Sequence, residues 1–189
     1  MKRVKPVRRA RTFVLIAFVI FAAALGALFL DKFESSRLKP VTPTHPPKMG
    51  SQVITLFFTA PDGSGLVREG RKVDACADPV QCIETLLSEL INGPVGDLTP
   101  TLPPNLIVRS VRVEGNVARI DLGREMLEGL PHGSASEMAA VYSIVNTIAF
   151  NVPQVNQVSF LINGSGIDTL LGHLDLRQPL PPDFTLEKK

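Results

Sequence analysis

His173 and Asp175 form a polar pair that no turn or helix cap explains in this sequence. An imidazole and a carboxylate two positions apart could transfer a proton or bind a metal ion. The alternative, which we favour, is that these side chains close the domain by hydrogen bonding to neighbouring backbone. Asp168 supplies another carboxylate nearby, but nothing in the sequence makes it face Asp175.

His132 and Ser134 place an imidazole near a hydroxyl, the combination that a nucleophilic hydrolase uses. Ser134 is equally suited to cap a helix, because Glu137 three positions later would complete a capping box. The glycine pair around Ser165 follows a strand pattern but lacks the Lys-Ser/Thr of a phosphate-binding loop, which leaves a tight turn. We therefore expect no enzymatic activity and no cofactor.

Cys76 and Cys82 are the two cysteines of the chain. Their separation permits a local disulfide in an oxidising compartment, and the alternative is a pair of partly buried free thiols. Two cysteines and three scattered histidines do not have the ligand spacing of a structural zinc site. We expect no metal site.

Residues 13–30 form an apolar run without a single charge. A helix of this length reaches about 27 Å, close to the hydrocarbon thickness of a bilayer. Six basic residues and no acidic ones precede the run, so the positive-inside rule places the N-terminus in the cytoplasm. The alternative is a cleaved signal peptide, but the apolar run continues beyond its small residues. We assign residues 1–11 to a cytoplasmic basic tail and residues 12–30 to a signal anchor in the cytoplasmic membrane.

Residues 31–50 are rich in proline, which predicts a semi-rigid spacer between the membrane and the domain. From residue 31 onward the chain carries 14 Lys and Arg against 18 Asp and Glu, a net charge of −4. Nucleic-acid binding needs a basic domain, so we expect no nucleic-acid partner.

The remaining patterns predict one small domain. Asp78 and Pro79 mark the start of a helix, and Gly93 with Pro94 marks its end. Gly115 and Asn116 form a hairpin turn. The order β-β-α-β-β-α-β predicts an α+β fold in two layers, a largely antiparallel sheet with two helices on one face. The predicted strands lie at 52–60, 66–73, 107–113, 117–122 and 155–162. The predicted helices run from Pro79 to the stop at Gly93 and over 125–130 and 134–151, within a domain spanning 51–183 and before a tail at 184–189.

Several short motifs resemble, in order and spacing, those of the GerMN domain, a module of sporulation and germination proteins. They include LINGP at 90–94, GNVA at 115–118, YSIVNT at 142–147 and VSFLING at 158–164, and the resemblance covers residues 53–180. The residues that carry the family pattern are Asp62, Gly63, Gly93, Pro94, Gly115, Ser134, Glu137, Asn146, Gly164, His173 and Asp175.

The resemblance implies a binding or scaffolding module of the bacterial cell envelope rather than a catalyst. GerMN domains look like the ring-building motifs of envelope assembly proteins, and some accompany cell-wall amidase domains. We hypothesise that the domain, tethered through residues 12–30, assembles with itself or with an envelope protein through open sheet edges and the strand face around Arg109, Arg112 and Arg119. The alternative is a peptidoglycan-binding module that serves cell-wall remodelling.

Overall fold

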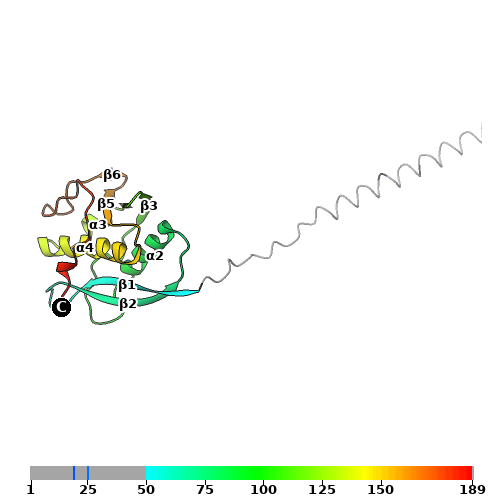
Figure 1. Ribbon diagram of the computed structural model, residues 1–189. Helices are drawn as coiled ribbons and strands as arrows, with labels where there is room; N and C mark the ends of the chain where they lie inside the picture. The colour runs from blue at the N-terminus through cyan, green and yellow to red at the C-terminus, as the bar shows by residue number, and fades with distance from the viewer. Residues whose placement is uncertain (1–18, 20–24, 26–49, 189) are drawn as a thin grey trace, which may run out of the picture. The chain divides into compact units, whose positions relative to one another are not determined.

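The computed structural model describes Val19, Leu25 and residues 50–188 (Figure 1). The predicted basic tail, and the predicted anchor and linker apart from Val19, Leu25 and Gly50, lie outside the described residues. Within the part of the chain that is described, no helix is long and apolar enough to cross a membrane.

The folded domain consists of two β-hairpins, each followed by helix, and a final strand pair. The element boundaries lie close to those predicted. In chain order the elements are β1 (Ser51–Thr59), β2 (Leu66–Asp74), α2 (Pro79–Ile91), β3 (Val108–Glu114), β4 (Val117–Leu122), α3 (Glu125–Glu128), α4 (Ser134–Asn151), β5 (Gln157–Ile162), β6 (Ser165–Gly166) and the 3-10 turn η1 (Phe184–Leu186).

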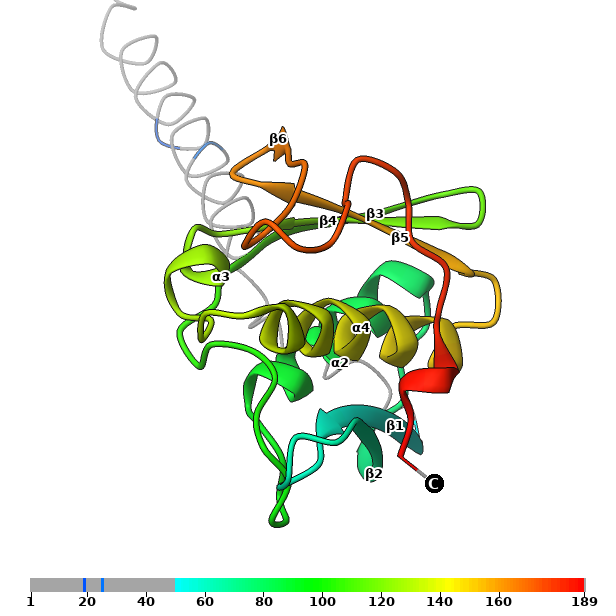
Figure 2. The ribbon, with the colours of Figure 1, turned by 90° about the vertical axis from the view of Figure 1, so that its left-hand side faces the viewer.

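The strands form two sheets, and the helices α2 and α4 lie between them (Figure 2). One sheet is the antiparallel pair β1–β2, and the other has the order β3-β4-β5-β6. The predicted α+β class is confirmed. The predicted arrangement of two layers with both helices on one face of a single sheet is wrong, because the helices form a middle layer.

The helices form a middle layer because α4 is buried around most of its circumference. The sequence pattern gives it one apolar stripe, but Ser143, Asn146 and Thr147 are also fully buried. A helix that is buried all round needs a partner on each side. Thr147 and Asn146 bond to backbone of other segments, and the Ser143 hydroxyl bonds to that of Thr101 at 2.7 Å.

Two polar side chains of α4, Asn151 and Thr147, explain why β1 does not join the larger sheet. The Asn151 side chain accepts a hydrogen bond from Thr55 N at 2.8 Å and donates one to Thr55 O at 2.6 Å. The Thr147 hydroxyl accepts a hydrogen bond from Phe57 N at 3.1 Å. Because α4 satisfies these backbone groups, the outer edge of β1 needs no neighbouring strand.

The four-stranded sheet contains one parallel pair, β4–β5, among otherwise antiparallel pairs. Helix α4 connects these two strands, and a crossover connection of this length returns the chain in the same direction. The β3–β4 hairpin turns at Gly115 and Asn116 as predicted, with Gly115 at φ 63°.

Local signals placed α2 correctly. Asp78 is its N-cap and accepts a hydrogen bond from Gln81 N at 3.0 Å, and Pro79 is its first residue. Gly93 takes the left-handed conformation at φ 78° just beyond the helix. The apolar stripe of α2 is buried in the core at Ile83, Leu86, Leu87 and Leu90.

Replacing Asn151 with leucine tests the contact between α4 and β1. The variant leaves Thr55 N and O without their partner, so we expect the free energy of unfolding to fall by about 2–4 kcal/mol. The matched control is Gln154→Leu on the exposed loop after α4, which should change it by less than about 0.5 kcal/mol. Urea denaturation followed by circular dichroism measures both. Equal losses in the two variants would contradict this role of Asn151.

Candidate interaction surfaces

The predicted capping box at the start of α4 does not form. The N-cap is Gly133, at φ 131° and without a side-chain hydrogen bond, and Ser134 is exposed as the first helical residue. His132 is also exposed, and within residues 50–188 the side chains of His132 and Ser134 form no hydrogen bond or ion pair with a second catalytic group. Glu137, the second residue of the expected capping box, bonds to a distant loop instead of to the start of α4.

Glu137 points into the protein and binds the loop at residues 170–173. Its side chain is fully buried, and one carboxylate oxygen accepts hydrogen bonds from Leu170 N at 2.9 Å and Leu171 N at 3.1 Å. The other oxygen accepts one from His173 N at 2.9 Å. Burial opposes ionisation, but these amide donors outweigh it and hold the pKa of Glu137 below its usual value. The carboxylate is therefore charged and structural.

Asn146 ties the C-terminal segment to the same helix. Its amide nitrogen donates to Asp183 O at 2.8 Å, and its amide oxygen accepts from Asp183 N at 2.9 Å. This side chain thus replaces a neighbouring strand for one residue of the C-terminal segment. The family residues Glu137 and Asn146 are both used to position backbone.

The expected His173–Asp175 pair does not form a site. The Asp175 carboxylate accepts hydrogen bonds from the Arg177 backbone at 3.0 Å and from its guanidinium at 2.9 and 2.6 Å. These bonds lower the pKa of Asp175 to about 2. His173 is exposed and is held through its backbone by Glu137.

Gly164 belongs to a tight turn between β5 and β6. Asn163 and Gly164 have φ values of 50° and 80°, as a two-residue hairpin turn between twisted strands requires. Gly164 N donates to the nearly buried carboxylate of Asp121 at 2.8 Å, and Arg109 lies 3.6 Å from that carboxylate. The sequence contains no phosphate-loop motif here, and the turn supplies none.

Asp62 and Gly63 lie in the turn of the first hairpin, against the C-terminal tail. Asp62 accepts hydrogen bonds from Ser64 N and Oγ, and Lys188 Nζ lies 2.6 Å from its carboxylate. These contacts lower the pKa of Asp62. Lys188 N also donates to Leu66 O at 2.8 Å, so the predicted tail at residues 184–189 contacts β2 and is not separate from the domain.

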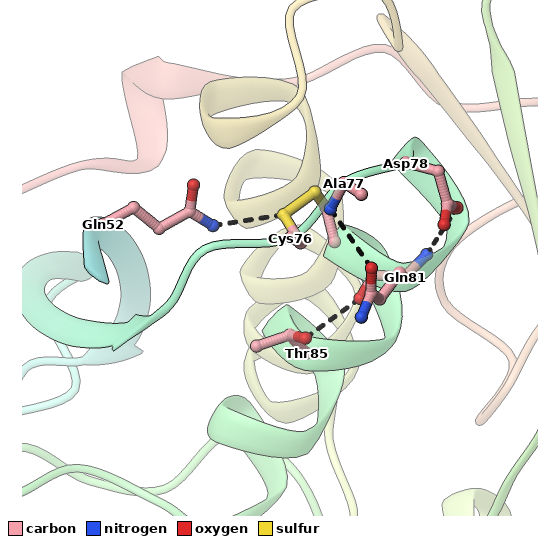
Figure 3. The surroundings of a disulfide bond; sticks show 7 residues. Gln52, Cys76, Ala77, Asp78, Gln81 and Thr85 are labelled. Carbon is pink, nitrogen blue, oxygen red and sulfur yellow. Dashed lines mark hydrogen bonds between the residues drawn. A yellow bond between two sulfur atoms is a disulfide. The ribbon is translucent and has the colours of Figure 1, made fainter. Parts of the chain in front are cut away.

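Cys76 and Cys82 are joined by a disulfide between the end of β2 and the first turn of α2, with their Cα atoms 5.2 Å apart (Figure 3). Gln81 lies beside it, where its side chain accepts a hydrogen bond from Ala77 N at 3.1 Å. Gln52 Nε2 on β1 lies 3.1 Å from the Cys76 sulfur. The bridge thus joins the first hairpin to the middle layer.

A cavity of about 470 Å³ opens between the β1–β2 turn, the first half of α4 and the C-terminal tail. Leu66, Met138 and Leu186 contribute apolar surface, and hydroxyl groups line much of the remainder. The charged lining residue, Glu187, pairs with Arg68 at 2.7 Å. A cavity with this lining fits a neutral ligand better than an anion. The hydrophobic periodicity of the sequence does not predict this cavity, because its walls come from segments that lie far apart in the chain.

The sheet edges differ in what covers them. The edge of β1 is held by α4, and β5 is flanked by β6 and by Leu180, which exchanges hydrogen bonds of 2.9 and 2.8 Å with Val158. The edge of β2 pairs with the tail at Leu66. Strand β3 is the terminal strand of its sheet, and no bridge from residues 50–188 pairs with its outer side.

The outer face of β3 and β4 carries Arg109, Arg112 and Arg119, which we call the arginine face. Arg112 and Arg119 are directly opposite each other across the two strands. Arg119 lies 3.6 Å from Glu114, whereas Arg112 forms no ion pair within the described domain. The arginine face therefore presents more positive than negative charge to solvent.

The family model described as "Germane: Sporulation and spore germination" matches residues 55–168. The chain belongs to the Germane domain family. The match runs from β1 to just beyond β6, so it includes both sheets, the two helices of the middle layer and the arginine face. The predicted GerMN resemblance is confirmed.

Solved structures support the same fold. The Germane domain is similar to a putative lipoprotein from Clostridium perfringens, with 24% identity, a TM-score of 0.52, and 70% of this chain and 88% of that chain covered. It is also similar to the tandem GerMN domains of the sporulation protein GerM from Bacillus subtilis, with 18% identity, a TM-score of 0.56, and 75% and 48% covered. The first GerMN domain of that protein gives 16% identity, a TM-score of 0.50, and 70% and 96% covered. No curated protein matches the chain.

Replacing Glu137 with glutamine tests its structural role in the Germane domain. The amide cannot accept hydrogen bonds at both of its ends, so we expect a loss of about 2–4 kcal/mol in the free energy of unfolding at pH 7. Because the folded pKa of Glu137 is lowered, its contribution is complete above the unfolded pKa of about 4.3 and disappears as pH falls through the folded pKa. The difference between wild type and variant should therefore shrink in acid.

The control is Glu128→Gln, which removes an exposed contact of 3.7 Å with Arg124 and should cost less than about 0.5 kcal/mol. Urea denaturation between pH 3 and pH 7 measures all three proteins. A difference that stays constant over that range would contradict an ionised Glu137.

Proposed function

We propose that this Germane domain is a non-enzymatic interaction module of the bacterial envelope. The predicted anchor at residues 12–30 tethers it to the cytoplasmic membrane with the N-terminus inside and the domain outside. There it assembles with itself or with an envelope protein. The observation that carries the proposal is the outer side of β3, which pairs with no strand among residues 50–188 and lies beside the arginine face. An uncovered strand edge is a site where another chain can pair.

The use of the family residues supports a scaffold rather than a catalyst. Glu137 and Asn146 bind backbone, and Asp62 and Asp175 pair with neighbouring basic residues. Each of these groups is occupied in holding the fold. Membrane attachment also agrees with the description of the similar Clostridium perfringens protein as a putative lipoprotein.

Cross-linking in living cells tests this proposal with the full-length protein. A photoreactive amino acid at Ser110 on β3 should capture a defined partner, which mass spectrometry identifies as the protein itself or an envelope protein. Exposed Gln154, on the loop after α4, is the control position. Reversing the charges of Arg109, Arg112 and Arg119 should abolish the cross-link because it removes the electrostatic match. Thermal unfolding first establishes that this variant folds.

Reversal of Arg124, the exposed N-cap residue of α3, serves as the charge control and should leave the cross-link unchanged. If every cross-linked partner survives the triple reversal, the arginine face is not the interaction surface.

Peptidoglycan binding is the second candidate function, favoured by the cavity of about 470 Å³. Hydroxyl groups of Thr59, Thr99, Ser136 and Thr185 line it, and these could bind the amides and hydroxyls of a neutral cell-wall fragment. Ala139→Phe would fill the cavity, and it should reduce co-sedimentation with purified sacculi. Arg112→Glu should not. No sedimentation of the wild-type protein would exclude this function.

A further inference from the structure

We infer that β3 binds an extended segment of a partner protein whose residues alternate between apolar and acidic. This inference rests on the proposed interaction function and names the partner's chemistry and mode of binding. The segment would add as a further strand to the sheet beyond β3, with its acidic side chains on the arginine face and its apolar side chains above α2.

The pairing length follows from the register of β3. The β3–β4 ladder shifts between Val108 and Ser110, which makes Arg109 the extra residue of a bulge. Ordinary pairing with β4 then runs from Ser110 to Glu114. An added strand therefore has about five residues of regular edge available, and a short extended segment is sufficient to occupy it.

The side chains of the added strand would meet two different surfaces. At the Ser110 end of that edge, its inward-pointing residues would lie next to a cleft of about 370 Å³ between α2 and the start of β3. Ile91, Leu106 and Val108 give this cleft apolar surface, whereas Glu84 and Ser88 line it from α2. Glu84 and Arg109 line the same cleft with opposite charges, so it is the apolar surface that favours small apolar residues at the inward positions nearest to it.

The outward-pointing residues would lie beside the arginine face. Arg112 and Arg119 are cross-strand neighbours, and like charges in that position destabilise a sheet. Within the described domain only Glu114 approaches either of them, 3.6 Å from Arg119. An acidic side chain on the next strand would neutralise Arg112 through a charge-assisted hydrogen bond.

Charge also separates this occupant from a second copy of the chain. Pairing of two β3 strands would place the arginine faces of both copies side by side on one sheet. That arrangement adds positive charges to a face that already has an excess, which opposes association. An acidic partner removes the excess instead.

The test uses the full-length protein in detergent micelles and a fluorescent synthetic peptide that alternates valine and glutamate. We expect fluorescence anisotropy to report binding that weakens by about tenfold in the Arg112→Gln variant, the factor that one charge-assisted contact contributes. The Arg124→Gln control should bind as the wild type does. Peptides with glutamine or lysine in place of glutamate should bind more weakly, the lysine peptide most of all.

Two further measurements locate the binding mode. A peptide with N-methylated backbone keeps its charges but cannot pair as a strand, so it should not bind. Nuclear magnetic resonance of the labelled protein should show the largest amide shifts in β3 when the acidic peptide is added. Binding that is unchanged in Arg112→Gln, shifts centred elsewhere, or no binding at millimolar peptide would each overturn the inference.

Failure of this inference is distinguishable from failure of the proposed function. If the cells still yield a β3 cross-link that depends on the arginine face while the acidic peptide does not bind, the interaction module stands and the acidic strand is wrong. If concentration alone shifts the β3 amides, a second copy occupies the edge and the acidic partner is likewise wrong.

Discussion

The whole domain depends on how α4 satisfies its buried polar side chains. Ser143, Thr147 and Asn151 recur at steps of four on one side of the helix, and each bonds to the layer that contains β1 or its neighbouring loop. On other sides, Glu137 and Asn146 bind the loop at 170–173 and the C-terminal segment. A buried polar group without a partner costs free energy, so these contacts fix where each segment lies. These hydrogen bonds fix the position of α4 relative to the layers on either side of it, which non-directional apolar packing would not do by itself.

This arrangement determines which surfaces remain available. Side chains of α4 occupy the edge of β1, and backbone of the C-terminal segment occupies positions beside β5 and β2. Strand β3 belongs to the sheet on the other side of the middle layer and has no such neighbour within residues 50–188. The fold thus combines a hydrogen-bonded interior with an edge at β3 that no strand or bridge from residues 50–188 covers. The bulge at Arg109 limits that edge to a short segment.

Sequence patterns predicted the individual elements well because caps, turns and periodicity are local. Asp78, Gly93 and Gly115 each act where their chemistry indicates. The layer order could not be read in the same way. Glu137 sits at a capping-box distance from Ser134, and the distant amides that it binds leave no local signal. The polar stripe of Ser143, Thr147 and Asn151 on α4 was the available clue, since it recurs at helical spacing beside the apolar stripe.

Amide hydrogen exchange resolved by nuclear magnetic resonance tests this account most directly. Four backbone amides donate to side chains of α4 instead of to a neighbouring strand, namely those of Thr55, Phe57, Leu170 and Leu171. We predict that they exchange nearly as slowly as the core of α4, whereas the β3 amides that point away from β4 exchange fast. Fast exchange at the four α4-bonded amides, or protection along the outer side of β3 in the isolated protein, would contradict the account.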